Sequence, residues 1–177
     1  MNNEINKEEG GEAFKEMQRI EALKARLVPS HKKDSRDVTE ADIDRVIEEA
    51  KILYEICFTP VGDYNGAFAM AHSQIDDKDP MKLFVTRERS IIINAKITRH
   101  SNYTVDSEEA CVSFPDRPQI IVPRWHKIEV EYMTIMVDPE DKDKFKLSSV
   151  QKESLSGRES FVWQHEIDHQ NSQFIYQ

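Results

Sequence analysis

The chain has 177 residues, which is enough for one domain with a continuous hydrophobic core. Its 33 acidic and 24 basic residues give a formal net charge of -9, and this charge disfavours nucleic acids and anionic membranes as partners. No apolar run is long enough to span a bilayer, and the first thirty residues lack the apolar core of a signal peptide, so we expect a cytoplasmic protein without membrane contact. Two cysteines, Cys57 and Cys111, are too few for a disulfide framework and are expected as thiols.

The N-terminal part of the chain predicts one weak and one strong helix. Residues 1–27 carry apolar residues three or four positions apart among many charges, which favours a partly helical N-terminal extension ahead of a main domain at 28–177. After a charged connector, Thr39 is suited to cap a second helix, with Asp42 three residues further on. A broad apolar face predicts that this long helix continues to about Cys57, which is expected to be buried.

The middle of the chain predicts strands and its end predicts a helix. A loop at 59–65 and a run of small residues at 66–71 come first. Apolar or alternating segments then predict strands at 82–86, 90–97, 119–122 and 127–137. A final helix is expected to begin after Ser156 or Gly157. Strands grouped between helices, without a repeating strand-helix alternation, indicate the α+β class.

The most informative motif is an H-E-x-x-H string in the final helix, formed by His165, Glu166 and His169. Residues four apart lie on one helix face with Cβ atoms roughly 5–6 Å apart, so both imidazoles are able to bind one metal ion. A catalytic site normally has three protein ligands, and Ile175 occupies the place where the extended metzincin motif has its third histidine. The third ligand is therefore expected upstream, and Cys111 is chemically the best candidate.

Several motifs together resemble the peptide deformylase family. They are EACVS at 109–113, QHEIDHQNS at 164–172, the small-residue segment that ends in Gln74, INAKI at 93–97 and VPRWHKIEVEY at 122–132. Their order and rough spacing agree with the family, and the resemblance runs from about residue 28 to 176. The short chain end after His169 is similar to compact members of phage type that lack a C-terminal helix.

The resemblance implies a fold and a set of roles. The fold would consist of antiparallel or mixed β-sheets packed around the C-terminal helix that carries HEIDH, with a long helix near the N-terminus. The metal ligands would be Cys111, His165 and His169. The general acid/base would be Glu166, with Gln74 and the backbone N–H of Val112 as donors to the developing oxyanion, and a Glu109–Arg124 pair would brace the cysteine loop.

The resemblance also implies the reaction and its components. The enzyme would be a metal-dependent amide hydrolase that removes the formyl group from N-formylmethionine at the N-terminus of new polypeptides and releases formate. The metal would be one divalent ion, ferrous iron first, with zinc, nickel or cobalt as substitutes. The partners would be formylmethionyl nascent chains near the ribosome, with no nucleic acid or membrane bound directly. The protein would be a cytoplasmic monomer, in a bacterium or in the host of a phage.

The sequence also departs from the family pattern in the first motif. Ala67 and Ala69 stand where the family has glycines, and His72 stands where it has alanine. A backbone that needs positive φ would be strained by alanine, and His72 is bulkier than alanine beside the site. Two other functions therefore stay open: a zinc endopeptidase of the H-E-x-x-H type, and a weakened deformylase-fold protein or binding module that keeps the metal site only for structure.

Overall fold

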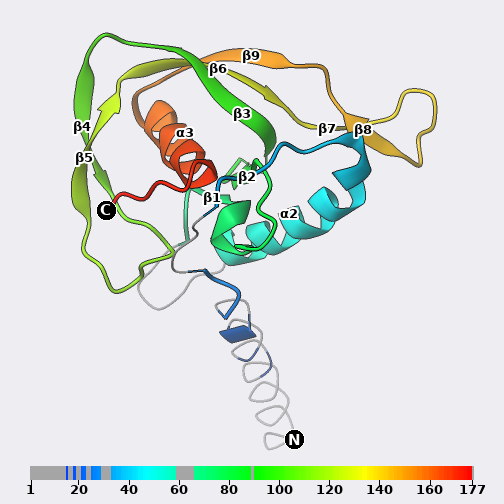
Figure 1. Cartoon of the computed structure of the whole chain (residues 1–177), viewed down its shortest axis with the longest axis horizontal. Helices are drawn as coiled ribbons and strands as arrows, with labels where there is room; N and C mark the ends of the chain where they lie inside the picture. Colours follow the sequence, from blue (N-terminus) through cyan, green and yellow to red (C-terminus); the bar gives the residue numbers. More distant parts are fainter. Residues whose placement is uncertain are drawn as a thin grey trace, which may run out of the picture.

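The structure is a computed structural model, and it describes residues 15, 18, 21–22, 25–28, 33–58, 66–88 and 90–176. It belongs to the α+β class, as the sequence predicted, with three antiparallel sheets and two α-helices in the described residues from 33 onward (Figure 1). The helical segments are η1 (Glu40–Asp42), α2 (Ile43–Phe58), η2 (His72–Gln74) and α3 (Gly157–Gln170). The strands are β1 (Ala69–Ala71), β2 (Leu83–Thr86), β3 (Ile91–His100), β4 (Thr104–Glu109), β5 (Ile120–Trp125), β6 (Lys127–Met133), β7 (Ile135–Val137), β8 (Phe145–Leu147) and β9 (Gln151–Ser156).

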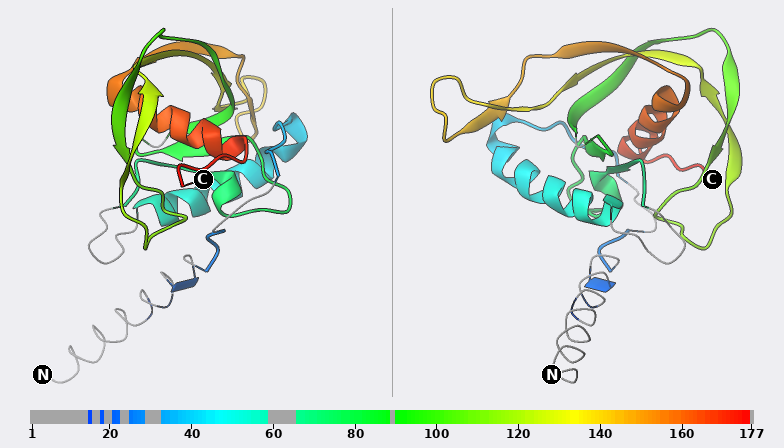
Figure 2. Two further views of the ribbon diagram at one scale, coloured as in Figure 1. Left: turned by 60° about the vertical axis from the view of Figure 1, so that its left-hand side comes forward. Right: turned by 180° about the vertical axis from the view of Figure 1, so that it is seen from behind.

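The largest sheet has the strand order β1-β2-β3-β6-β9, and β4-β5 and β7-β8 form two smaller sheets. The long strands curve around α3, so that β4 and β5 lie on one side of this helix and β1 on the other (Figures 1 and 2). The β7-β8 hairpin extends away from α3, past the end of α2. The curvature of the long strands therefore encloses the helix that carries the histidines.

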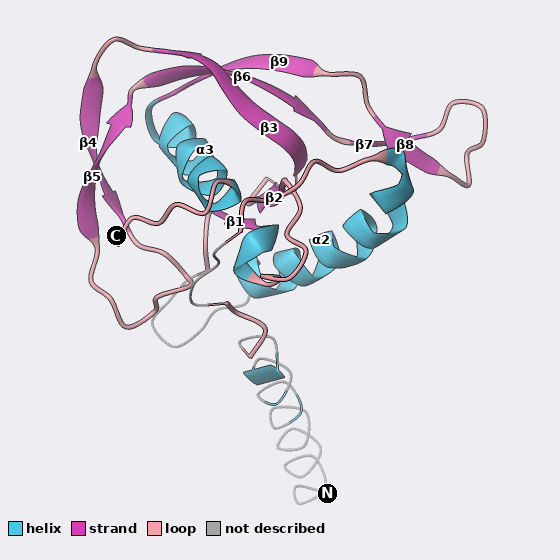
Figure 3. Ribbon diagram, in the orientation of Figure 1, coloured by secondary structure: helices cyan, strands magenta, loops and turns pink. Residues whose placement is uncertain are grey.

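The two helices pack on opposite sides of β1 and β2 (Figure 3). Successive side chains of a strand point to opposite faces. Accordingly Leu83 and Val85 belong to the hydrophobic cluster against α2, whereas Phe84 belongs to the cluster against α3. A strand that is buried on both faces needs apolar residues on both, which explains why Leu83, Phe84 and Val85 form a continuous apolar run.

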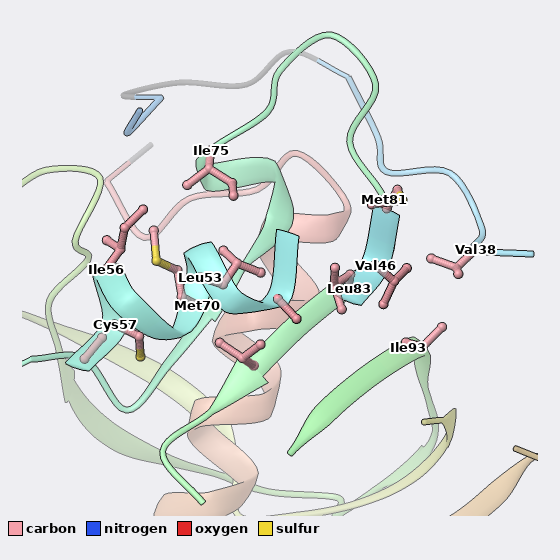
Figure 4. Close-up of a cluster of buried hydrophobic side chains, with 13 residues drawn as sticks. Val38, Val46, Leu53, Ile56, Cys57, Met70, Ile75, Met81, Leu83 and Ile93 are labelled. Carbon is pink, nitrogen blue, oxygen red and sulfur yellow. The ribbon is translucent and has the colours of Figure 1, made fainter. Parts of the chain in front are cut away.

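The long helix predicted from Thr39 to about Cys57 is confirmed as η1 followed by α2. The Asp42 carboxylate accepts hydrogen bonds from both the backbone N–H and the hydroxyl of Thr39, each at 2.9 Å. These bonds satisfy donors at the start of the helix, as a capping arrangement does. The helix then contributes Val46, Ala50, Leu53, Ile56 and Cys57 to the cluster in Figure 4.

Helix α3 fills the space inside the curved sheet. Its Trp163 is 5% exposed and meets the rings of Phe84 and Tyr132 edge to face, both with centroids 5.1 Å apart. Such aromatic contacts add to the stabilisation that the buried area supplies. Gly157 begins the helix with a φ of +58°, a value that glycine adopts without strain. The direction of α3, and hence of its histidines, is fixed by this packing.

The segment at 127–137 was predicted as one strand, and this prediction is wrong at Thr134. The ladder breaks there because β6 pairs with β3 and β9, whereas β7 turns away to pair with β8. Ser148 exchanges two hydrogen bonds with the Thr134 backbone at the break, at 2.8 and 3.0 Å. Strands β1, β4, β8 and β9 were not predicted at all.

The predicted N-terminal helix lies largely outside the described residues, although Lys15, Gln18, Glu21 and Ala22 are helical. Leu27 packs against the cluster around α2, and the Val28 N–H donates to the Gln74 carbonyl at 2.8 Å. Within the described residues, no helix combines the length and the hydropathy that crossing a bilayer requires.

Candidate metal centre

Three side chains from two elements converge in the described part of the chain: Cys111, His165 and His169. Cys111 follows β4, and the histidines lie one turn apart on α3. The His169 Nε2 atom is 3.3 Å from the Cys111 Sγ atom and 3.1 Å from the His165 Nε2 atom, and all three candidate ligand atoms lie within 4.8 Å of one another. Cys111 and His169 are buried and His165 is half-buried. The structure therefore brings the three predicted ligands together.

A second set of contacts orients the His165 ring. The Nδ1 atom of His165 lies 2.9 Å from the Glu109 carboxylate, so its Nε2 atom faces the other two ligand atoms. Arg124 donates two hydrogen bonds of 2.8 Å to the same carboxylate, and its remaining nitrogen donates to Asp168. A carboxylate behind a ligating imidazole is a common means of fixing the ring and its tautomer.

Charge balance keeps Glu109 ionised although it is only 9% exposed. Burial alone would raise the pKa of this carboxyl, but the hydrogen bonds from Arg124 and His165 hold the pKa at about 2. The predicted Glu109–Arg124 pair is thus a bidentate ion pair between β4 and β5, and Asp168 connects it to α3. The pair joins the cysteine-bearing and histidine-bearing parts of the site.

Glu166 lies next to the ligands and lines the same pocket as Gln74 and His165. The side chain is 3% exposed, and its Oε2 atom has no hydrogen-bond partner within the described residues. Burial raises the pKa of this carboxyl to about 7, even though neighbouring cationic groups oppose the shift. A buried carboxyl whose pKa is close to neutrality is able both to accept and to donate a proton.

Gln74 lies in η2 with its amide turned toward the cysteine. Its Oε1 atom accepts from the Ala71 N–H at 2.9 Å, and its Nε2 atom donates to Ser113 Oγ at 3.1 Å and to Cys111 Sγ at 3.7 Å. Val112 also lines the pocket, and its backbone N–H has no partner in the described residues. Both predicted oxyanion donors are therefore close to the converging ligands.

The alanines that replace family glycines cause no backbone strain. Ala67 and Ala69 do not have positive φ. The neighbouring residue that does is Gly66, with a φ of +83°. A Cβ atom on Gly66 would also lie 2.6 Å from the Cys57 carbonyl oxygen, so the glycine requirement falls on Gly66. His72 is fully buried in the core and does not line the pocket.

The pocket beside the converging ligands has a volume of about 220 Å³. Phe161 and Val162, one turn before His165 on α3, give it an apolar wall. Its polar groups come from Gln74, His165 and Glu166 and also from Ser107, Glu108, Glu109, Gln119 and Arg158. A pocket with an apolar wall and convergent polar groups is a usual form of a small-molecule or peptide-end site.

The donor set fits a divalent metal. Two imidazole nitrogens and a thiol sulfur approach one another from three directions, and metals bound by such ligands have bonds of about 2.0 to 2.3 Å. A cation bound between these atoms would reduce the repulsion between the two closely spaced Nε2 atoms. Three protein ligands and an open pocket are the arrangement of a catalytic rather than a structural site.

The profile of the polypeptide deformylase family matches residues 32–177 of this chain. The chain belongs to the polypeptide deformylase family. Peptide deformylase 2 of Nostoc is 35% identical over 82 residues, which are 46% of this chain and 39% of that relative. The match to this relative thus spans well under half of the relative's length.

Solved deformylase structures share the fold. The class I type b peptide deformylase of Acinetobacter baumannii is 19% identical with a TM-score of 0.64, covering 85% of this chain and 99% of that one. A structure from a Vibrio parahaemolyticus bacteriophage, in complex with actinonin, is 24% identical with a TM-score of 0.59, covering 81% of this chain and 91% of that one. The expected deformylase fold is confirmed by these likenesses.

Sequence reasoning missed some residues of this deformylase family site. Ser113, which accepts from Gln74, and Asp168, which accepts from Arg124, lie inside the cysteine and histidine motifs, but the motifs alone do not indicate a role for them. The apolar wall was also missed, although Phe161 and Val162 precede His165 by four and three residues, and this helical spacing places them on the face of His165.

Proposed function

We propose that this chain is a metal-dependent hydrolase that removes the formyl group from N-formylmethionine at the N-terminus of polypeptides and releases formate. The observation that carries the proposal is the convergence of Cys111, His165 and His169 beside Glu166 in one pocket. Membership in the deformylase family supports the same reaction.

The candidate ligands would hold one divalent ion, which would supply Lewis acidity and lower the pKa of water. We propose ferrous iron as that ion, with zinc, nickel or cobalt as substitutes. The single thiolate of Cys111 lowers the net positive charge of the centre, and a mixed thiolate and imidazole set suits these metals.

The residues of the chain would carry the proton transfers. Glu166 takes a proton from the attacking water, which adds to the formyl carbon, and later gives that proton to the leaving amine as the carbon-nitrogen bond breaks. The Gln74 amide and the Val112 N–H donate to the oxygen on which negative charge develops. For Gln74 this requires its Nε2 atom to exchange the bond to Ser113 for a bond to the substrate.

The shape of the pocket supports methionine as the first residue. Phe161 and Val162 lie one turn from His165, so a linear apolar side chain would lie against them while the formyl group reaches the ligands. We further propose residues 28–177 as the catalytic domain, with 1–27 as an extension, and a monomer that acts on nascent chains in the cytoplasm, near the ribosome.

The test is formate release from formyl-Met-Ala-Ser by protein purified anaerobically with iron or nickel. We expect formate and a free methionyl amine in equal amounts. Cleavage of an internal peptide bond without formate would instead support the endopeptidase function. Metal binding without either product would support a binding module.

A further inference from the structure

Arg158 has an unusual place at the edge of the catalytic pocket. It lies in the first turn of α3 and lines the same pocket as Gln74, His165 and Glu166. The centre of its guanidinium group is 3.9 Å from the centroid of the Phe68 ring, which lines the same pocket from the segment before β1. A cation at this distance from an aromatic ring is attracted to the ring face.

This stacking leaves the charged edge of Arg158 available. The side chain is exposed and makes no ion pair or hydrogen bond within the described residues. A guanidinium that stacks through its face keeps its N–H groups in the plane, where they match the two oxygens of a carboxylate. Because the ring restricts the side chain, less rotamer entropy is lost when a ligand binds.

The position of Arg158 along α3 sets what it is able to reach. Arg158 precedes His165 by seven residues, which is about 10 Å at the rise of an α-helix. In an extended formyl peptide, the Cα atoms of the second and third residues lie about 6 and about 10 Å from the formyl carbon. The methionine side chain would occupy the apolar stretch of Phe161 and Val162 in between, so the next residues come within reach of Arg158.

A second hollow, of about 710 Å³, continues from the catalytic pocket and shares Phe68, Arg158 and Val162 with it. A peptide that leaves the catalytic pocket in this direction passes over the Phe68 ring and Arg158. We propose that Arg158, stacked on Phe68, selects formyl peptides with an acidic second or third residue. This inference rests on the proposed function.

The other charges of the pocket do not cancel Arg158. The Glu109 carboxylate is engaged by Arg124 and His165, and Glu166 is buried. Glu108 is exposed, but it comes from β4 beside the cysteine loop rather than from α3. Arg87 also lies over the Phe68 ring, 4.6 Å from its centroid, and Glu88, Glu153 and Glu159 line the second hollow as well. Among the arginines that line the two hollows in the described residues, Arg158 is the one common to both, so it is the cation at the place where the peptide would pass from one to the other.

The experiment compares two pairs of C-terminally amidated peptides: formyl-Met-Asp-Ala with formyl-Met-Asn-Ala, and formyl-Met-Ala-Asp with formyl-Met-Ala-Asn. At low salt we expect about a three- to fivefold higher kcat/KM for the aspartate member of at least one pair, mainly through KM. The preference is expected to shrink in high salt. In R158Q it is expected to disappear, and in R158K to persist in part.

Two variants separate Arg158 from other effects. R99Q removes one positive charge from β3, outside the two hollows, and is expected to keep the preference. F68L keeps an apolar side chain but removes the ring, and is expected to weaken the preference.

Equal kcat/KM values within both pairs in the wild type, or a preference that survives R158Q, would overturn the inference while formate release upholds the proposed function. If no peptide releases formate, the proposed function fails. Calorimetric binding of the same peptides to E166Q then decides the inference, because equal Kd values would reject it and tighter binding of the aspartate peptides would support it.

Discussion

Protonation of His72 is expected to destabilise the protein as the pH falls through the mildly acidic range. The imidazole is fully buried, and its Nδ1 atom accepts a hydrogen bond of 3.0 Å from the Met81 N–H. A second proton would place an N–H on Nδ1, so that two donors would face each other. The Nε2 atom is 4.0 Å from Glu49, a carboxylate that already pairs with Arg26.

The size of the effect follows from the pKa of His72 in the folded and the unfolded protein. Burial lowers the pKa from 6.5 to about 4 in the folded protein. Between these values the unfolded chain binds more protons than the folded one, so stability is complete above pH 6.5 and falls as the pH drops toward 4. A difference of this size corresponds to about 3 kcal/mol, at about 1.4 kcal/mol per pH unit.

Urea unfolding at several pH values between 7 and 4.5 measures this effect. The comparison is the wild type against H72N, whose amide oxygen is able to accept from the Met81 N–H but does not titrate. H72N is expected to be less stable at pH 7, because a smaller side chain leaves space, and to lose much less stability on acidification. Carboxylates and the other histidines titrate in both proteins, so their contributions to the pH dependence of the free energy of unfolding cancel in the difference. If the difference in the free energy of unfolding between the wild type and H72N does not change with pH, the reasoning is refuted.

The remaining predictions concern the candidate centre. E166A is expected to keep bound metal, measured by elemental analysis, while kcat falls by about 10² to 10⁴-fold; loss of metal would contradict a role in proton transfer. C111S is expected to lower metal content after dialysis, and unchanged content would remove Cys111 from the ligand set. R124M leaves the buried Glu109 carboxylate without its main partner and is expected to lower the free energy of unfolding by about 3 to 5 kcal/mol, measured in urea. A loss below 1 kcal/mol would mean that this ion pair does not hold the strands.

The elements that sequence predicted best are those with a regular apolar pattern. Helix α2 carries such a pattern along most of its length, and β2 and β3 contain continuous apolar runs. The strands that were not predicted lack a regular apolar pattern. Strand β4 buries Ser107 and Glu109, both polar, because its inner face meets the site rather than a hydrophobic core. Strand β9 lies at a sheet edge and buries Leu155 alone, so its six residues have the composition of a loop.

The candidate ligands were predictable from the sequence. The H-E-x-x-H spacing places His165 and His169 on one helix face, and the cysteine motif of the family identifies Cys111. The contacts around these ligands were not predictable, because they depend on pairings between distant strands. Asp168 reaches Arg124 only because α3 lies against β5, and Arg158 meets Phe68 only because α3 lies against β1. The sequence also could not show that Ala67 and Ala69 avoid positive φ.

The contacts of Arg124 have a further consequence for how the centre is assembled. Arg124 on β5 holds Glu109 on β4 and Asp168 on α3, and Glu109 in turn holds the His165 ring. None of these bonds involves an atom that would bind the metal, so the position of the His165 ring does not depend on an ion. Small proteins whose folding depends on metal unfold when the ion is removed. We therefore expect this deformylase family member to stay folded when the ion is removed, so that the metal supply around it sets its occupancy.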